Sequence, residues 1–412
     1  MRNFLILSLI LSALLLASCK KESNKTGELK PVQLTEKQKL IIDQSNTFGF
    51  DFFRKSYALS TGQSNLMVSP LSVSMAFGMV RNGASGLTLQ EINHALGMDS
   101  MSNSEINESY KYIMETFSSL DPGVKMEIAN SIWYRNTFNV EKDFVNTNTE
   151  YFNSEVTPLD FNSTEAVSTI NSWVSAHTNQ LIPKIINQIP SDMVMYLINA
   201  IYFKGQWRDQ FDKKNTLDKP FKLEDGSTKN CPMMARHSTI AYFEGDGFEA
   251  IELPYSQGNF NMVVMLPGEG KSVSDIVNQL SSEKWSNWYQ RFLSTDVHLL
   301  LPRFTFSFDE KGMKQIMADM GMQSAFNPDL ADFTRINKEG SLYISEVKHK
   351  TFIETNEEGT EAAAVTSIGV GVTSVPVTKD FIVDKPFVFF IHERTSGTIL
   401  FIGTVKDPTL TE

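Results

Sequence analysis

Serine, histidine and cysteine side chains that could act in catalysis are present in this 412-residue chain, but their spacing matches no hydrolase. A serine nucleophile is usually held in a strained turn marked Gly-x-Ser-x-Gly, with a histidine as its base. The nearest stretch, Gly83-Ala84-Ser85-Gly86, has the wrong spacing and fits the end of a helix better. We therefore expect no nucleophilic active site.

The sequence also lacks motifs for a metal-binding or phosphate-binding site. The six histidines are scattered without a His-x-x-x-His pair, the two cysteines form no Cys-x-x-Cys pair, and the chain has no Gly-rich phosphate loop. Ser345 and Lys348 have the spacing of a penicillin-recognising nucleophile pair, but the matching triad Lys25-Thr26-Gly27 precedes them instead of following. The sequence predicts that the protein is not an enzyme and needs no cofactor.

The remaining functional candidate is the stretch from Ala362 to Thr378, which has no charged residue. Read with a period of two, one set of alternating side chains is uncharged throughout, so that face can be buried in a sheet. The set comprises Thr360, Ala362, Ala364, Thr366, Ile368, Val370 and Val372. The other set carries Glu361 and two glycines, which weaken a strand. The segment is compatible with an exposed loop in one state and a central strand in another; a plain surface loop is the alternative.

Helical patterns gather in the first half of the chain and strand patterns in the second, which predicts an α+β fold with large sheets. Helices are expected at about 36–57, at Pro70–Gly83 behind an N-cap at Ser69, and from a capping box of Thr88 and Glu91 to near Gly97. Strands are expected at 126–134, 195–203, 250–253, 260–266, 297–308, 342–354, 387–391 and 399–405, with a hairpin turn at 393–397. Without an internal linker or repeat, one large domain is expected.

Several short motifs together resemble one known family. Gly359-Thr360-Glu361-Ala362-Ala363-Ala364, preceded by Glu358, resembles the hinge of the serpins, at the start of their reactive-centre loop. Similar motifs elsewhere are Asn65–Ser72 at the entry to a helix, Asn199–Trp207 in a central strand, Asp384–Ile391 near the C-terminus, and His349 ten residues before the hinge glycine. They occur in order and with the family's spacing over nearly the whole mature chain, so the chain is identified as a member of the serpin family.

The resemblance implies helices packed around three β-sheets, with an exposed reactive-centre loop near the C-terminus. It also implies a polar cluster called the shutter, which lies under the central strands where they part. Its members here are Ser69, Ser72, Asn199 and His349. Trp207 matches the tryptophan of the breach, where the loop enters the sheet. The simpler alternatives are satisfied polar residues and an aromatic residue of an ordinary core.

The function implied is irreversible inhibition of serine proteases by a suicide-substrate mechanism. The family's loop length places the scissile bond at Thr373-Ser374, with Val372 and Val375 as alternatives. The flanking residues are small and aliphatic, which favours elastase-like or subtilisin-like targets, with cysteine proteases as a further class. We expect a monomer that forms a covalent acyl complex with its target protease. A non-inhibitory serpin that acts as a binding module is the alternative; a secreted hydrolase lacks a recognisable nucleophile.

The N-terminus predicts export. Residues 1–18 have the charged start and apolar run of a signal peptide, and Leu16-Ala17-Ser18-Cys19 resembles a bacterial lipobox, in which Cys19 is lipidated. Residues 19–37 are polar and are expected to form a flexible tether to a serpin domain at 38–412. The predicted location is a bacterial outer membrane, on its cell-surface or periplasmic side. An ordinary cleaved signal is the alternative.

Charge and cysteine content argue against two further features, nucleic-acid binding and an intrachain disulfide. A net charge of −11 argues against a nucleic-acid partner, which calls for a clustered basic surface. If Cys19 is lipidated, Cys231 is the one cysteine left, so no disulfide can form within the chain.

Overall fold

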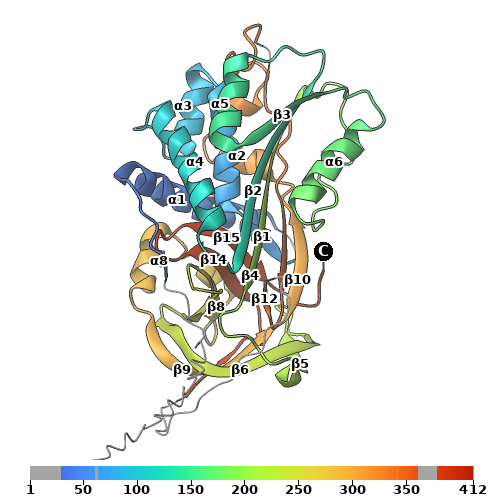
Figure 1. Ribbon diagram of the computed structural model, residues 1–412. Coiled ribbons are helices and arrows are strands. Elements are labelled where there is room, and N and C mark those ends of the chain that lie inside the picture. The colour runs from blue at the N-terminus through green and yellow to red at the C-terminus, as the bar shows by residue number, and fades with distance from the viewer. Residues whose placement is uncertain (1–28, 61–63, 341, 361–377, 412) are drawn as a thin grey trace, which may run out of the picture.

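The computed structural model describes residues 29–60, 64–340, 342–360 and 378–411, and it has the predicted α+β fold (Figure 1). Its helices are α1 (Glu36–Leu59), α2 (Pro70–Gly83), α3 (Gly86–Ala95), α4 (Asn103–Ser119), α5 (Lys142–Phe152), α6 (Ala166–His177), α7 (Val273–Val277), α8 (Ser282–Tyr289) and α9 (Met313–Asp319), with 3₁₀ turns η1 (Lys213–Asn215) and η2 (Ser324–Phe326). Its strands are β1 (Leu66–Val68), β2 (Val124–Arg135), β3 (Ser154–Leu159), β4 (Met195–Gln206), β5 (Leu217–Lys222), β6 (Thr228–Gly245), β7 (Phe248–Pro254), β8 (Phe260–Pro267), β9 (Leu293–Pro302), β10 (Phe304–Asp309), β11 (Lys350–Thr355), β12 (Gly359–Thr360), β13 (Lys379–Ile382), β14 (Phe387–Glu393) and β15 (Ile399–Val405).

Among the described residues the strands form two hydrogen-bonded sheets, where the family resemblance implied three. One has six strands in the order β10-β11-β12-β4-β2-β3, and the other has nine, including β1-β15-β14-β8-β7-β6-β9-β13 with β5 paired to β6. The long strand β6 accounts for the difference. Its first part pairs with β5, its middle with β9 and its last residues with β7, so it joins two groups of strands into one hydrogen-bonded sheet.

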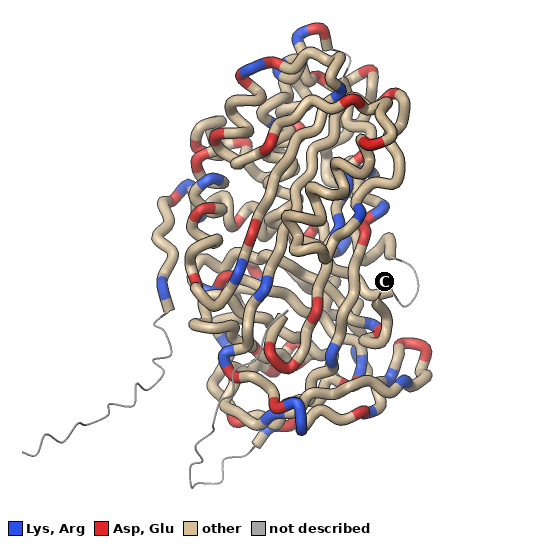
Figure 2. Tube along the Cα trace, turned by 45° about the vertical axis from the view of Figure 1, so that its right-hand side comes forward, with Lys and Arg blue, Asp and Glu red and all other residues tan. Residues whose placement is uncertain are grey.

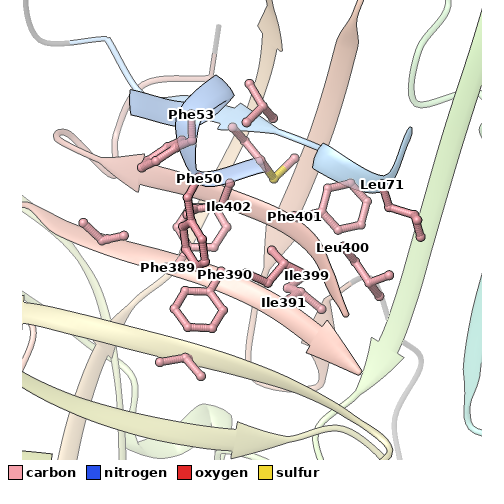
Figure 3. Close-up of a cluster of buried hydrophobic side chains, with 14 of the residues drawn as sticks. Phe50, Phe53, Leu71, Phe389, Phe390, Ile391, Ile399, Leu400, Phe401 and Ile402 are labelled. Carbon is pink, nitrogen blue, oxygen red and sulfur yellow. The ribbon is translucent and has the colours of Figure 1, made fainter. Parts of the chain in front are cut away.

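The main core lies between the two sheets and the helices of the N-terminal half. Helix α2 contacts both β4 and β15, and α1 packs on α2. Figure 3 shows the side chains of β14 and β15 meeting those of α1 and α2. The labelled residues are Phe50, Phe53, Leu71, Phe389, Phe390, Ile391, Ile399, Leu400, Phe401 and Ile402, and all are buried. Because β14 and β15 are buried along their whole length, they read as continuous apolar runs instead of alternating ones.

Helix starts follow the local sequence where a capping residue is present. Thr35 and Gln38 form a capping box at the start of α1, and Ser69 accepts from the Ser72 amide with Pro70 as the first residue of α2. The predicted box of Thr88 and Glu91 is wrong, because α3 begins earlier, at Gly86. Thr88 accepts from the Asp332 amide at 2.9 Å and the Glu91 carboxylate accepts from the Ser324 amide at 2.6 Å, so both side chains bind a distant segment.

Two predicted strands differ from the structure. The run 297–308 is split at Arg303 into β9 and β10, which belong to different sheets. In the run 342–354, the strand covers only Lys350–Thr355, and 342–349 lies outside any strand. The neighbour of β11 on its β4 side is β12, whose described residues are Gly359 and Thr360. Within the part of the chain that the structure describes, no strand pairs with 342–349, so this stretch has no ladder to join.

The part of the expected tether that the structure describes, residues 29–37, is not a free linker. Helix α1 begins at Glu36, and the Asn259 amide group pairs with the backbone of Lys30 through bonds of 3.2 and 2.6 Å. The Val32 amide donates to Thr395 Oγ1 at 2.9 Å, so residues 30–32 are docked on the domain.

In the part of the chain that the structure describes, no helix combines the length and apolar character required to cross a membrane. Basic and acidic residues are interspersed over the face shown in Figure 2.

Candidate functional site

The first two residues of the hinge lie inside the six-stranded sheet. Gly359 and Thr360 form β12 between β11 and β4, with Thr360 opposite Thr355 on one side and Gly205 on the other. The Thr360 side chain is only 4% exposed, and its Oγ1 lies 2.7 Å from the Tyr255 hydroxyl. The alternation in the sequence predicted this inward orientation for Thr360.

Glycine is required at position 359 for two reasons. Its φ of 150° is one that residues with a Cβ rarely adopt, and an added Cβ would lie 2.1 Å from the Gly205 carbonyl oxygen. The hinge therefore enters the sheet at a point where two backbones approach closely.

An aromatic pair, Trp207 and Tyr255, contacts the hinge. Trp207 stacks on Tyr255 with ring centroids 4.5 Å apart and an interplanar angle of 11°. The Trp207 indole N–H donates to the Asn356 carbonyl at 2.9 Å, and its backbone amide donates to the Glu358 carbonyl at 2.9 Å. Trp207 thus lies where strand β4 meets the hinge.

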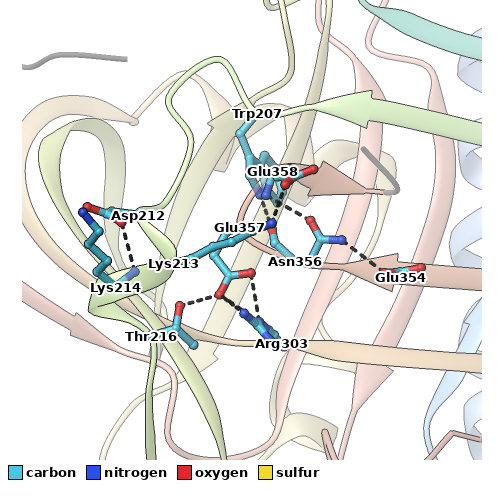
Figure 4. A network of polar contacts seen from close by, with 10 residues as sticks. All are labelled: Trp207, Asp212, Lys213, Lys214, Thr216, Arg303, Glu354, Asn356, Glu357 and Glu358. Atoms are coloured by element: carbon cyan, nitrogen blue, oxygen red, sulfur yellow. Dashed lines mark hydrogen bonds and ion pairs between the residues drawn. The ribbon is translucent and has the colours of Figure 1, made fainter. Parts of the chain in front are cut away.

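Two acidic residues before the hinge form ion pairs with basic side chains of other segments (Figure 4). The Arg303 Nε donates to both carboxylate oxygens of Glu357, at 2.8 and 2.9 Å, and Thr216 also bonds this carboxylate. Burial pushes the pKa of Glu357 up, but the hydrogen bonds from Arg303 and Thr216 outweigh burial and hold that pKa below its ordinary value. The Lys213 ammonium lies 2.5 Å from the Glu358 carboxylate. The two residues just before the hinge are therefore held in place by these ion pairs and hydrogen bonds.

The four shutter residues predicted from the resemblance lie together beneath β4 and β11. The Ser69 amide donates to His349 Nε2 at 3.0 Å, and the Ser69 hydroxyl donates to the Leu400 carbonyl at 2.7 Å. The Ser72 hydroxyl donates to Asn199 Oδ1. The Asn199 amide in turn donates to Asn130 Oδ1 at 2.6 Å. This buried network links α2, β2, β4 and the residue before β11.

His349 must be neutral in this network, because its Nε2 accepts a hydrogen bond. Burial lowers the pKa of His349 to about 4, from an ordinary value near 6.5. Below pH 6.5 the unfolded chain binds a proton at this histidine that the folded chain does not bind. The stability that neutral His349 contributes is therefore complete above pH 6.5 and is lost as the pH falls toward 4.

We predict that moving from pH 7.5 to pH 5 lowers the free energy of unfolding by about 2 kcal/mol through this one group. Urea unfolding at both pH values measures the change. His349→Gln is the matched control, because glutamine offers an acceptor and does not titrate. An equal acid-induced loss in the variant would show that His349 is not the source.

The structure also brings in residues that sequence reasoning missed. Asn130 completes the polar network, Tyr255 supports the hinge, and Arg303 anchors Glu357. A polar residue at an inward position of the apolar run 126–134 was a signal for Asn130; the sequence offers no comparable signal for Arg303. Glu361, Ala362, Ala363, Ala364, Thr373, Ser374 and Cys19 lie outside the described residues.

Within the described ranges, no three His, Cys, Asp or Glu side chains come together in a way that could hold a metal ion. Cys231 is buried and free, and burial raises the pKa of its thiol to about 11, so it is a poor nucleophile.

Comparison with known proteins agrees with the fold and the hinge geometry. Residues 43–408 match the family model described as Serpin (serine protease inhibitor). Human neuroserpin is 34% identical over 362 residues, which cover 85% of this chain and 88% of neuroserpin. The leukocyte elastase inhibitor of Xenopus tropicalis is 32% identical over 372 residues, covering 88% of this chain and 97% of that protein. The crystal structure of the thermophilic serpin Tengpin in its native state superposes with a TM-score of 0.81 at 32% identity, covering 92% of this chain and 97% of Tengpin.

The chain therefore belongs to the serpin family. Its members are described as inhibitors of serine proteases and not as catalytic enzymes, so target proteases are the class of partner that the family implies.

Proposed function

We propose that this protein is an irreversible suicide-substrate inhibitor of serine proteases with elastase-like or subtilisin-like specificity, and that cysteine proteases are a second class of target. The observation that carries the proposal is the position of Gly359 and Thr360 between β11 and β4. A loop whose first two residues already occupy a sheet position needs only to continue in the same register to become a full strand.

The register of β12 supports this continuation. Extended by two-residue steps, it would put Ala362 between Phe203 and Ile353. Thr366 would arrive between Asn199 and His349. Each of these four flanking residues is buried, so the uncharged set of alternating side chains would enter the core face.

A cavity at the far end of the same path supports the proposal independently. It has a volume of about 140 Å³ and lies between α2, β4 and the stretch 342–347. Continued in register, Ile368 would lie between Leu197 and Val347, and Val370 between Met195 and Ser345. All four flanking residues line the cavity. Filling an apolar void with a buried Ile or Val side chain contributes about 1.5–3 kcal/mol for each.

The mechanism follows from the free energy that insertion of the loop would release. The protease serine attacks the carbonyl carbon of the scissile bond, expected at Thr373-Ser374 with Val372 and Val375 as alternatives, and an acyl-enzyme forms as the new amino terminus leaves. Insertion of the freed loop then carries the acylated protease away from the breach before water can hydrolyse the ester. Strand addition of this kind supplies ladder hydrogen bonds as well as apolar burial.

Incubation with pancreatic elastase and with subtilisin tests the proposal. We expect an SDS-resistant complex on gels, together with a released C-terminal peptide whose mass identifies the scissile bond. Trypsin is the matched control, because the bond has no cation beside it and is expected to be cut slowly there. Cleavage by elastase and subtilisin without any covalent complex would favour the non-inhibitory alternative, in which the loop does not insert.

We further propose that the protein acts as a monomer held at a bacterial membrane by a lipid on Cys19, on the cell-surface or periplasmic side of the outer membrane. Because Lys30 is docked on the domain, ten residues separate it from Cys19, and the two residues can be at most about 40 Å apart. Cys19→Ser should move the protein from the membrane fraction to the soluble one and abolish palmitate labelling. Membrane association that survives the substitution would contradict lipid anchoring.

A further inference from the structure

Two histidine–aspartate pairs lie on the exposed face of the three neighbouring strands β6, β9 and β13. His237 Nε2 on β6 lies 2.9 Å from Asp296 Oδ2 on β9. His298 Nδ1 on β9 lies 2.9 Å from Asp380 Oδ1 on β13. Strand β13 is the one that follows the loop region. Just before it, the Thr378 hydroxyl donates to Asp296 at 2.8 Å.

The two histidines face each other across the ladder. In the antiparallel pairing of β6 and β9, His237 is directly opposite His298, so their side chains project from the same face. Residues opposed in this way have Cβ atoms about 5 Å apart, within reach of one shared ion for two imidazole rings. Their side chains are 57% and 46% exposed, which leaves them open to solvent.

The carboxylates fix which ring nitrogen of each histidine is available. A carboxylate accepts, so the neutral His237 carries its proton on Nε2 and has its lone pair on Nδ1. By the same reasoning His298 carries its proton on Nδ1 and has its lone pair on Nε2. Carboxylates that hold and polarise imidazoles from behind are the usual outer partners of metal-binding histidines.

We propose that His237 Nδ1 and His298 Nε2 bind one divalent late transition-metal ion, with Asp296 and Asp380 as the outer carboxylates and water in the remaining coordination positions. With two protein ligands, such a site is smaller than the three-residue groups that are absent from the described ranges. Imidazole ligands suit Cu²⁺, Ni²⁺ and Zn²⁺, and the order of affinity should follow Cu²⁺ above Ni²⁺ and Zn²⁺.

The bound ion would join β6 to β9 directly. Its outer carboxylates would also connect it to β13. Asp380 belongs to this strand, and Asp296 accepts a hydrogen bond from Thr378 just before it. Among the described residues, β13 is the edge strand of the nine-stranded sheet and pairs with β9 alone, over Lys379–Ile382. The site would therefore reinforce the point where the chain returns to the sheet after the loop region.

Isothermal titration of the full chain with CuCl₂, NiCl₂ and ZnCl₂ at pH 7.5 tests the proposal, with Cys19→Ser in every sample so that no N-terminal thiol competes. We expect one site per chain and at least a tenfold weaker dissociation constant in His237→Ala and in His298→Ala. Asp296→Asn and Asp380→Asn should weaken binding less, because the ligands themselves remain. His94→Ala is the matched control, since His94 is an exposed histidine in a similar pair with Asp99, at 3.0 Å, but lacks an opposed histidine.

Binding that is unchanged in both His237→Ala and His298→Ala would overturn the proposal, as would a loss of equal size in His94→Ala. The substituted side chains are exposed, and thermal melts of each variant without metal would verify that the fold is intact. Because the titration uses no protease, its outcome is independent of whether the protein inhibits proteases.

Discussion

Thr360→Arg should convert the protein from an inhibitor into a substrate of its target proteases. Thr360 is buried, and its hydroxyl shares a hydrogen bond with Tyr255 inside the sheet. An arginine there would bring an unpaired charge to a buried position, at a cost of several kcal/mol in the inserted state. The loop would still be cut, but slow insertion would leave time for the acyl-enzyme to hydrolyse.

The expected result is at least a tenfold rise in the number of inhibitor molecules consumed for each protease molecule inactivated, measured by titration against elastase or subtilisin. Gels should show the cleaved inhibitor in place of the SDS-resistant complex. Glu361→Arg is the matched control, because the neighbouring residue belongs to the opposite set of alternating side chains and should retain inhibition. If Thr360→Arg still formed the complex as efficiently as the unsubstituted protein, the inward register of the hinge would be refuted.

Cleavage of the loop alone should raise the melting temperature by tens of degrees. Of the described residues, Gly359 and Thr360 of β12 are the ones that lie between β4 and β11, and an apolar cavity lies at the end of this path. Adding a strand there supplies ladder hydrogen bonds at about 1 kcal/mol each and buries apolar side chains. A single added kcal/mol raises the melting temperature by about 2–4 °C in a domain of 150–250 residues, so many together produce a large shift.

Calorimetry or circular dichroism before and after limited cleavage with a non-target protease measures this shift. The uncut protein is expected to unfold at a temperature set by kinetics, so scans at several rates are required. Cleaved Thr360→Arg serves as the control, since its loop is cut but inserts poorly, and it should gain much less. An unchanged melting temperature in the cleaved, unsubstituted protein would mean that the uncut fold is not metastable and would favour the non-inhibitory alternative.

The amino-acid sequence was sufficient to predict features that depend on local spacing. The period of two predicted the inward side of Thr360, and the serine–proline pair at Ser69 and Pro70 predicted the start of α2. The apolar runs at 387–391 and 399–405 predicted the central strands β14 and β15. These predictions held because each depends on a side chain and its close neighbours along the chain.

Features that depend on distant partners required the tertiary structure. Thr88 and Glu91 fit a helix cap in the sequence, yet segment 324–332 binds both side chains. The strand expected over 342–354 is limited to β11, because a ladder needs a neighbour, and among the described residues β12 supplies Gly359 and Thr360. Asn130, Tyr255 and Arg303 enter the site from strands and turns far from the hinge in the sequence. Local patterns determine which face of an element can be buried. Only the packed chain decides which groups meet there. A contact between residues far apart in the sequence produces no periodic pattern near either residue.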